Sequence, residues 1–520
     1  MVERDRVVPG PVVRTCVWPA RRGQGIMTAD REVRMADREL AGVVVAAGPD
    51  GRRSTTALGQ AVLAAALRPV DEPGAAAVER STAWRSDYPA HFRRLVEAGL
   101  PDPKSWLTVA ESGLAELDRQ LRLARADGSE DALPAALTEA AGRELGTAEV
   151  AGTAEPESEL VLPYRGRRLR GDEIRRQVEA WIAAGVAEPS LVEPVEDVLA
   201  HPEWLRLGGV TVAALGAGAE MAPVPSLLRW GATVAAVDLP VPALWQRLRR
   251  TARAGAGRLL VPVDPRTGAD GADLLTEVPA VAEWLAGQPG RLVLGTYAYA
   301  DGGLHLRLSG AADVLGRRLR QRRDDLTLAF LATPTDTFAV PGDAVAHAIG
   351  RYARRSAGTA LLRPAVHAVS RGRLLQPPYQ PGGDPGVNDS LIPQQGPNYA
   401  LAKRVQRWRA AVARAAGTPV SFHVAPSART RSVVKHRVLA AAFNGAHHFG
   451  VEVFEPATAS TLLAALLVRD LNTAPAQRAH PWQDEAYAAV HGGLWRAGYA
   501  PRSVLGFALL LGALRRTPRY

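Results

Sequence analysis

The chain has 520 residues, of which 47% are hydrophobic and 22% are charged, an ordinary globular composition with room for two or three domains. Its net charge of +10 is spread among Ala, Gly and Pro without a nucleic-acid-binding motif, so we expect a solvated basic surface and no nucleic-acid partner. The single cysteine, Cys16, excludes a disulfide framework and a cysteine-based metal site, and it favours a cytoplasmic location.

Neither end of the sequence carries a targeting or membrane signal. The first 26 residues contain five arginines and no long apolar core, unlike a secretory signal. Val504 to Leu514 is an apolar run of 11 residues, whereas a membrane-spanning helix needs about 20. We therefore expect no integral membrane segment and a buried terminal helix.

The first 200 residues show no catalytic constellation. Residues 1–50 have scattered Arg, Pro and Gly and are predicted to be weakly ordered. Residues 51–200 place apolar side chains such as Leu114 and Leu117 at helical spacing and predict a helical domain. Within it, residues 144–160 are acidic and small, which is typical of a linker.

A strand, a glycine turn, a helix and a second strand follow one another in the middle of the chain. The apolar run 209–215 ends in Gly216 and Gly218, and the strand predicted at 233–237 ends in Asp238. Glycines at such a turn let the backbone approach a diphosphate, and an acid about 20 residues further on accepts hydrogen bonds from a ribose hydroxyl. This is the Rossmann arrangement, and it indicates a dinucleotide site.

Three more apolar runs follow at similar intervals, separated by helical stretches. They end in Asp264, in a glycine turn at Gly295 and in Thr333. This alternation predicts an α/β fold, a doubly wound parallel sheet over residues 201–520 behind the N-terminal helical domain. Ligands of such sheets bind at the carboxyl ends of the strands, where these residues would gather.

Residues 336–395 interrupt this rhythm. The segment contains one helical piece and then Q-P-P-Y-Q-P-G-G-D-P-G-V-N-D-S, which is rich in Pro and Gly. A structureless stretch of this length is uncommon unless it has a function, so we expect an insertion that serves as an active-site lid.

Directly after the insertion, Tyr399 and Lys403 are four residues apart and would share one face of a helix. The chain has only three lysines, Lys104, Lys403 and Lys435, so a Y-x-x-x-K pair is expected by chance only about 0.06 times. An ammonium beside a phenol favours the phenolate, and the spacing therefore predicts a lowered pKa for Tyr399.

Together these features resemble the short-chain dehydrogenase/reductase family over roughly residues 208–496. The resemblance rests on the glycine turn, the acids after the second and third strands, Gly295, the Tyr399/Lys403 pair, and a strand that ends in Pro426-Ser427 with Thr430 close behind. It implies that Tyr399 exchanges a proton with the oxygen of an alcohol or carbonyl substrate. It also implies that Lys403 lowers the pKa of Tyr399 and binds the nicotinamide ribose.

The resemblance implies a nicotinamide cofactor, NAD or NADP, which transfers the hydride. NAD is favoured, because the charge of Asp238 repels a 2′-phosphate. The residues expected to bind the cofactor are Gly216, Gly218, Asp238, Asp264, Gly295, Lys403, Pro426 and Thr430. A helper hydroxyl is expected from Thr335 or Ser390. Where the family has its later glycines, this chain has Glu220, Met221 and Ala222.

Two other functions remain open at this point. A methyltransferase that uses S-adenosylmethionine also has a glycine turn and an acid after the second strand, but it has no use for Tyr399 and Lys403. A non-catalytic binding or scaffold protein could keep the fold with an altered glycine turn. We expect a small-molecule substrate of unknown identity, and a homo-oligomer is compatible with these features. No metal site is expected, because adjacent His447 and His448 would point about 100° apart on a helix.

Overall fold

The computed structural model describes residues 41–138, 143–354, 364–366, 368–435, 437–474, 476 and 478–514. Residues 41–520 cluster into one compact unit. None of the helices within the described ranges has both the length and the apolar character needed to cross a membrane. The predicted disorder of residues 1–50 falls mostly outside the described residues; within the last ten of them, Gly42–Val45 form strand β1.

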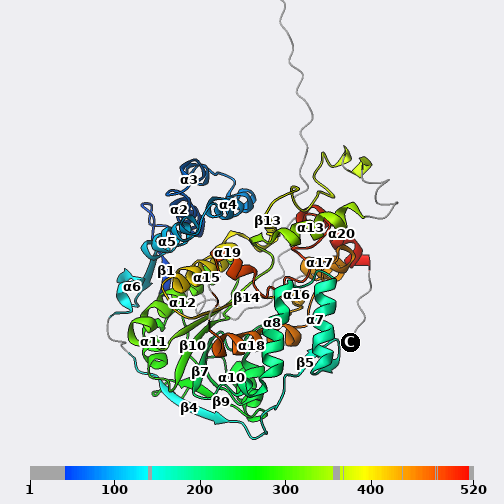
Figure 1. Ribbon diagram of the computed structural model, residues 1–520. Helices are drawn as coiled ribbons and strands as arrows, with labels where there is room; N and C mark the ends of the chain where they lie inside the picture. Colours follow the sequence, from blue (N-terminus) through cyan, green and yellow to red (C-terminus); the bar gives the residue numbers. More distant parts are fainter. Residues whose placement is uncertain are drawn as a thin grey trace, which may run out of the picture. The chain divides into compact units, whose positions relative to one another are not determined.

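A seven-stranded sheet organises this unit (Figure 1). Its order is β14-β11-β10-β7-β8-β9-β4, and every neighbouring pair is parallel except β9 and β4. The strands are β4 (Gly146–Ala151), β7 (Val210–Leu215), β8 (Thr233–Val237), β9 (Arg258–Val263), β10 (Arg291–Thr296), β11 (Thr327–Ala332) and β14 (Val420–Val424). From β7 the chain runs outward through β8 and β9 and then crosses back to β10, β11 and β14. The α/β class and the mostly parallel sheet are confirmed, and the order is compatible with a Rossmann-like fold.

Helices cover both faces of the sheet, because alternate side chains of each strand point to opposite sides. Leu215, Leu294 and Leu328 belong to a core shared with three helices, α11 (Val278–Ala286), α12 (Gly303–Arg322) and α15 (Pro397–Ala415). The opposite face, which includes Val212 and Val293, packs against α9 (Val224–Trp230), α10 (Pro242–Arg253) and α18 (Pro456–Asn472).

Four helices near the start of the described chain form an outer layer on α15. They are α2 (Thr55–Leu67), α3 (Glu72–Glu79), α4 (Trp84–Gly99) and α5 (Pro103–Gln120). Side chains of Ser54, Asp71 and Asp102 cap the N-termini of α2, α3 and α5. Helix α5 approaches α15 so closely that a Cβ at Gly113 would collide with the Trp408 ring. The predicted helices are present, and their core is continuous with that of the sheet.

The predicted linker at residues 144–160 is wrong. Residues 146–151 form β4, which pairs antiparallel with β9 in the register Val150↔Leu259 and closes one edge of the sheet. Only Val150 of this strand is fully buried. An edge strand that buries one apolar side chain can be built from small and acidic residues, and such a composition is easily mistaken for a linker.

Two small sheets and several short helices make up the rest of the described chain before residue 208. Strands β1, β2 (Leu121–Ala124) and β3 (Glu130–Ala132) form one sheet, and β5 (Leu162–Tyr164) and β6 (Arg167–Leu169) form the other. The helical pieces are α6 (Leu133–Ala136), α7 (Asp172–Ala183), η1 (Pro189–Leu191), α8 (Val192–Ala200) and η2 (Pro202–Arg206).

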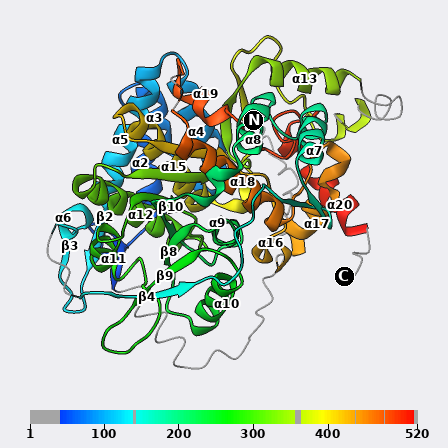
Figure 2. The same ribbon diagram turned by 60° about the horizontal axis from the view of Figure 1, so that its bottom comes forward.

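The predicted insertion contains more regular structure than its composition suggests. Strand β12 (Thr337–Val340) pairs antiparallel with β13 (Gly386–Asp389). Helix α13 (Gly342–Ala353), which lies between them in sequence, is labelled in Figure 2. The short helix η3 (Pro393–Gln395) then leads into α15. Residues 355–363, within the predicted lid, lie outside the described part of the chain.

The C-terminal part adds α16 (Arg431–Lys435), α17 (Arg437–Gly445), η4 (Ala446–Phe449), α19 (Pro481–Ala486) and α20 (Pro501–Leu514). Helices α17 and α20 touch closely, since a Cβ at Gly512 would collide with the backbone at Ala441. The terminal helix is only half buried, contrary to the prediction, because Leu510 is 59% and Leu514 73% exposed.

Candidate active site at the carboxyl end of the sheet

Tyr399 lies in the first turn of α15, beside the carboxyl end of β11. Pro397 opens this helix after Gly396, whose φ of 81° turns the chain into it. The hydroxyl of Thr333, the residue that follows β11, lies beside the Tyr399 phenol and lowers its pKa in part. The structure therefore brings the predicted tyrosine to the strand end where ligands of such folds bind.

Donors and acceptors can be assigned to the hydrogen bonds that lead from Gln395 to Thr333. The backbone N–H of Ile392 donates to Oε1 of Gln395 at 3.1 Å, which turns the Nε2 amide group of Gln395 toward Thr335. That amide donates to Oγ1 of Thr335 at 2.7 Å, and the hydroxyls of Thr335 and Thr333 are 2.9 Å apart. Either hydroxyl of this pair can be the donor, but the Gln395 amide donates to Thr335, so the Thr335 proton is free to point toward Thr333. The Tyr399 phenol donates no hydrogen bond to a described residue, so its proton is available to a ligand.

Lys403 lies one turn below Tyr399 and points toward the same strand. Its ammonium donates to the Leu331 carbonyl oxygen at 3.1 Å and to Oε1 of Gln406 at 3.2 Å. Among the described residues it forms no ion pair with a carboxylate. Burial lowers the pKa of Lys403 to about 8, and the more distant Asp336 opposes that shift. The role at a nicotinamide ribose is untested, because both bonds of the ammonium are made within the protein.

The pKa of Tyr399 moves in the opposite direction to the one predicted from its spacing to Lys403. Burial raises the pKa of Tyr399 to about 12, although the hydrogen bond from Thr333 lowers it in part. The physical reason is desolvation, because the half-buried phenolate would lose more hydration than a single hydroxyl donor restores. Lys403 directs its ammonium to the carbonyl of Leu331, where its charge does little for the phenolate.

His305 is a member of this site that the sequence did not reveal. It lies in the first turn of α12, is 1% exposed, and neither of its ring nitrogens has a hydrogen-bond partner among the described residues. Its ring stacks on that of Tyr399, with centroids 5.4 Å apart, and the ring of Tyr299 packs against both. Burial and the charge of Lys403 lower the pKa of His305 to about 3, so the imidazole is neutral. The only feature of the sequence that pointed to His305 was its position just after the glycines that follow β10.

The glycine turn after β7 has the geometry of a tight turn. Gly216 has a φ of 80°, and a Cβ there would collide with the backbone at Ala298. The N–H of Gly218 donates to Oδ2 of Asp238 at 2.8 Å, and Leu239 N–H donates to Oδ1 at 2.8 Å. The structure thus brings Gly216, Gly218 and Asp238 together as predicted. Burial raises the pKa of Asp238.

Glu220 occupies the region where the resembling family has a later glycine. Its carboxylate accepts hydrogen bonds from the backbone N–H of Arg431 at 2.7 Å and from the Arg431 side chain at 3.2 Å. A dinucleotide fits these residues in part: Asp238 and the glycine turn suit the adenosine half. A carboxylate beside the diphosphate position would repel it, since like charges at short range disfavour each other.

The other predicted cofactor residues have mainly internal contacts. Asp264 accepts from the Arg266 N–H and the Thr267 hydroxyl and pairs with Arg143 at 3.1 Å. A Cβ at Gly295 would collide with the Tyr297 ring, so this glycine is required for packing. Pro426 and Thr430 follow β14 at the carboxyl edge, beside the Arg431 that holds Glu220.

The two predicted helper hydroxyls have different positions. Thr335 belongs to the hydroxyl chain that ends at Tyr399. Ser390 is fully buried, and its hydroxyl donates to Oδ1 of Asn388 at 2.5 Å. Asn388 in turn donates to the Tyr379 hydroxyl. Thr335 and Thr333 therefore remain candidates for positioning Tyr399, while Ser390 belongs to a separate buried network.

Comparison of the chain with protein-family models, with curated proteins and with solved structures gave no match.

Proposed function

We propose that this protein is an oxidoreductase that transfers a hydride between a nicotinamide dinucleotide and an alcohol or carbonyl substrate. The observation that carries the proposal is the placement of Tyr399 at the carboxyl end of β11, with its oxygen held by Thr333 and Lys403 one turn below. A phenol that accepts one hydrogen bond from the protein can give its own proton to a ligand oxygen.

Each residue of the site would have its own role in the reaction. Tyr399 holds the proton that the substrate oxygen receives when a carbonyl is reduced. Thr333 stabilises the phenolate left behind, and Gln395 fixes the direction of the hydroxyl chain through Thr335. His305 holds the Tyr399 ring by stacking and, being neutral, does not compete for its proton. The bound nicotinamide supplies the hydride.

A second candidate, a non-catalytic Rossmann-like binding module, is favoured by one observation. Glu220 places a carboxylate at the glycine turn, and Arg431 ties it to the segment after β14. In a protein that had lost dinucleotide binding, this pair would be a structural clamp across the turn. Methyl transfer from S-adenosylmethionine has no such support, because that reaction would not use Tyr399 or the hydroxyls of Thr333 and Thr335.

The test is NADH and NADPH oxidation by the purified protein with a panel of aldehydes and ketones, followed at 340 nm. Tyr399→Phe should reduce turnover at least 100-fold, the range expected for loss of a general acid. Tyr487→Phe is the matched control, because Tyr487 is also half buried but bonds Glu193 elsewhere on the protein. Equal turnover by Tyr399→Phe and the control would contradict the proposed role.

A further inference from the structure

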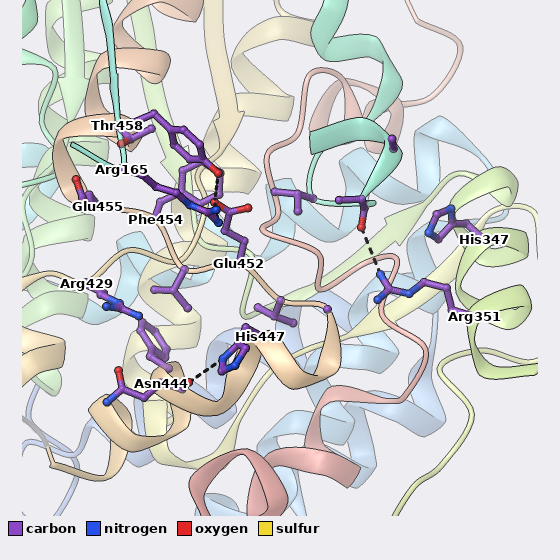
Figure 3. Close-up of a pocket in the computed structure, with 18 of the residues that line it drawn as sticks. Arg165, His347, Arg351, Arg429, Asn444, His447, Glu452, Phe454, Glu455 and Thr458 are labelled. Atoms are coloured by element: carbon purple, nitrogen blue, oxygen red, sulfur yellow. Dashed lines mark hydrogen bonds and ion pairs between the residues drawn. The ribbon is translucent and has the colours of Figure 1, made fainter. Parts of the chain in front are cut away.

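A large cavity lies away from the residues of the hydroxyl chain (Figure 3). Its volume is about 1110 Å³, at the upper end of small-molecule sites. Six parts of the chain form its walls: the turn at Tyr164 and Arg165, the end of α7 with the residues after it, helix α13, the segment at Arg429, the region of α17 and η4, and residues 450–458. These parts are far apart in the sequence, so the cavity exists only in the folded protein.

The cavity wall carries an excess of positive charge. Four arginines line it, Arg165, Arg351, Arg354 and Arg429, against two carboxylates, Glu452 and Glu455. Glu452 is already neutralised, because it pairs with Arg165 at 3.1 Å and accepts a hydrogen bond from the Tyr164 hydroxyl at 2.7 Å.

Three of these arginines have no carboxylate partner among the described residues. Arg351, Arg354 and Arg429 form no ion pair there, whereas arginines elsewhere in the chain pair extensively, as Arg407 does with Asp336. Glu455 is exposed and offsets one of the three charges at most. The cavity therefore keeps a net positive charge that the protein itself does not neutralise.

Arg351 is held in a defined position. Its guanidinium donates to the Ala184 carbonyl oxygen at 3.3 Å, as Figure 3 shows. It also lies against Gly450, where a Cβ would collide with it. An arginine that is fixed before binding loses less conformational freedom when it meets an anion. Neighbouring His347 adds no charge at neutral pH, because burial and the nearby arginines lower its pKa.

Another part of the wall is apolar. Val186 and Phe454 are buried beside it, and Phe443, Val451 and Val453 complete this side. The Phe454 ring is fixed by the Trp181 ring, with centroids 5.1 Å apart. Arg351 and Arg429 lie at opposite sides of the cavity (Figure 3), whereas Arg354 follows Arg351 by three residues at the end of α13. A cavity with cations at one part and apolar side chains at another suits a ligand with the same division.

We propose that this cavity binds a small anion, a phosphomonoester or a carboxylate, that carries an apolar body. Arg351 and Arg354, three residues apart at the end of α13, bind the charged group, since guanidinium donors match the oxygens of phosphate and carboxylate. The apolar body lies against Phe454 and its neighbours. Binding is measured directly and requires no turnover, so failure of this proposal and failure of the oxidoreductase proposal are distinguishable.

The test is calorimetric titration of the full-length protein at fixed ionic strength with hexyl phosphate, hexanoate, hexanol and inorganic phosphate. Hexyl phosphate or hexanoate should bind, and whichever binds more tightly identifies the head group. Arg354→Gln should weaken that binding about tenfold, and Arg351→Gln with Arg354→Gln about a hundredfold. The matched control is Arg80→Gln with Arg320→Gln, two exposed arginines at the C-cap of α3 and on α12, and it should bind like wild type.

Three results would overturn the proposal. They are an absence of binding by both anions, equal affinity of wild type and the Arg351/Arg354 double variant, or binding of hexanol as tight as that of the anions. Inorganic phosphate binding as tightly as hexyl phosphate would remove the apolar half of the proposal. Arg354→Gln alone decides the case if the double variant is unfolded, because Arg354 is exposed and its side chain makes no ion pair with a described residue.

Discussion

The imidazole ring of His305 lies nearly flat on the phenol ring of Tyr399, with centroids 5.4 Å apart and planes 20° apart. His305 is almost completely buried, and within the described part of the chain neither of its nitrogens has a hydrogen-bond partner. An unsatisfied buried polar group lowers the stability of the fold. The location of His305 beside Tyr399 and Lys403 therefore indicates a position that is determined by a requirement other than stability.

His305→Phe should therefore stabilise the protein. The substitution keeps a stacked ring on Tyr399 and removes two unpaired nitrogens, so we expect the free energy of unfolding to rise by about 1–3 kcal/mol. Urea denaturation measures this change. His201→Phe, at an exposed histidine that stacks on Trp204, is the control and should change stability little. A loss of stability in His305→Phe would show that the imidazole is satisfied within the protein.

Thr333→Val should impair the Tyr399 phenol more than Thr335→Val does. Thr333 lies beside the phenol and lowers its pKa, whereas Thr335 is hydrogen-bonded to Thr333 and Gln395. Loss of the donor raises the pKa of Tyr399 further, so turnover at pH 7 should fall about tenfold and the alkaline limb of the pH profile should move upward. The measurement is a pH–rate profile of both variants. A larger defect in Thr335→Val would contradict the direction assigned to the hydroxyl chain.

Lys403→Met should make the protein more stable at pH 7 while reducing its activity. Burial lowers the pKa of Lys403 from 10.5 to about 8, so the unfolded chain holds this proton more tightly than the folded one. Wild-type stability should therefore rise between pH 8 and pH 10.5, and below pH 8 the buried ammonium costs roughly 3 kcal/mol at most. Lost hydrogen bonds to Leu331 and Gln406 offset part of the gain, which leaves about 1–2 kcal/mol.

Chemical denaturation of wild type and Lys403→Met at pH 7, 8.5 and 10.5 checks this. The stability difference should shrink as the pH rises, because the wild-type lysine loses its proton in both states. A difference that stays constant over this range would show that the pKa of Lys403 is not lowered by folding.

Much of the sheet could be predicted from the sequence. Strands β7, β8 and β10 are buried on both faces, so each appears as a continuous apolar run that ends in a glycine or an acid. Strand β4 was not predicted, because an edge strand that buries only Val150 needs no continuous apolar run. Short antiparallel strands in the insertion were missed for a similar reason, since Pro and Gly surround them.

The site was predicted less completely, because its chemistry depends on contacts between distant residues. The spacing of Tyr399 and Lys403 gave the helix and the shared face. The spacing could not show that the Lys403 ammonium donates to the Leu331 carbonyl of β11. Nor could it show that burial has a larger effect than this ammonium on the pKa of the Tyr399 phenol. His305 and the pairing of Glu220 with Arg431 arise only when segments far apart in the sequence meet.

Glu220→Gln should strengthen binding of NADH. The substitution removes the carboxylate charge at the glycine turn while keeping its size, and we expect about a tenfold gain in affinity at low ionic strength. Glu149→Gln, at an exposed glutamate on β4, is the control and should leave binding unchanged. Equal affinity in Glu220→Gln and wild type would show that Glu220 does not face the diphosphate.

The most direct test of the central proposal is a fluorescence titration of the wild-type protein with NADH, with NADPH and S-adenosylmethionine alongside. Saturable binding of NADH, tighter than that of NADPH because Asp238 stands at the end of β8, is the result that the oxidoreductase proposal predicts. No binding of either nicotinamide dinucleotide at millimolar concentration, by wild type or by Glu220→Gln, would contradict it.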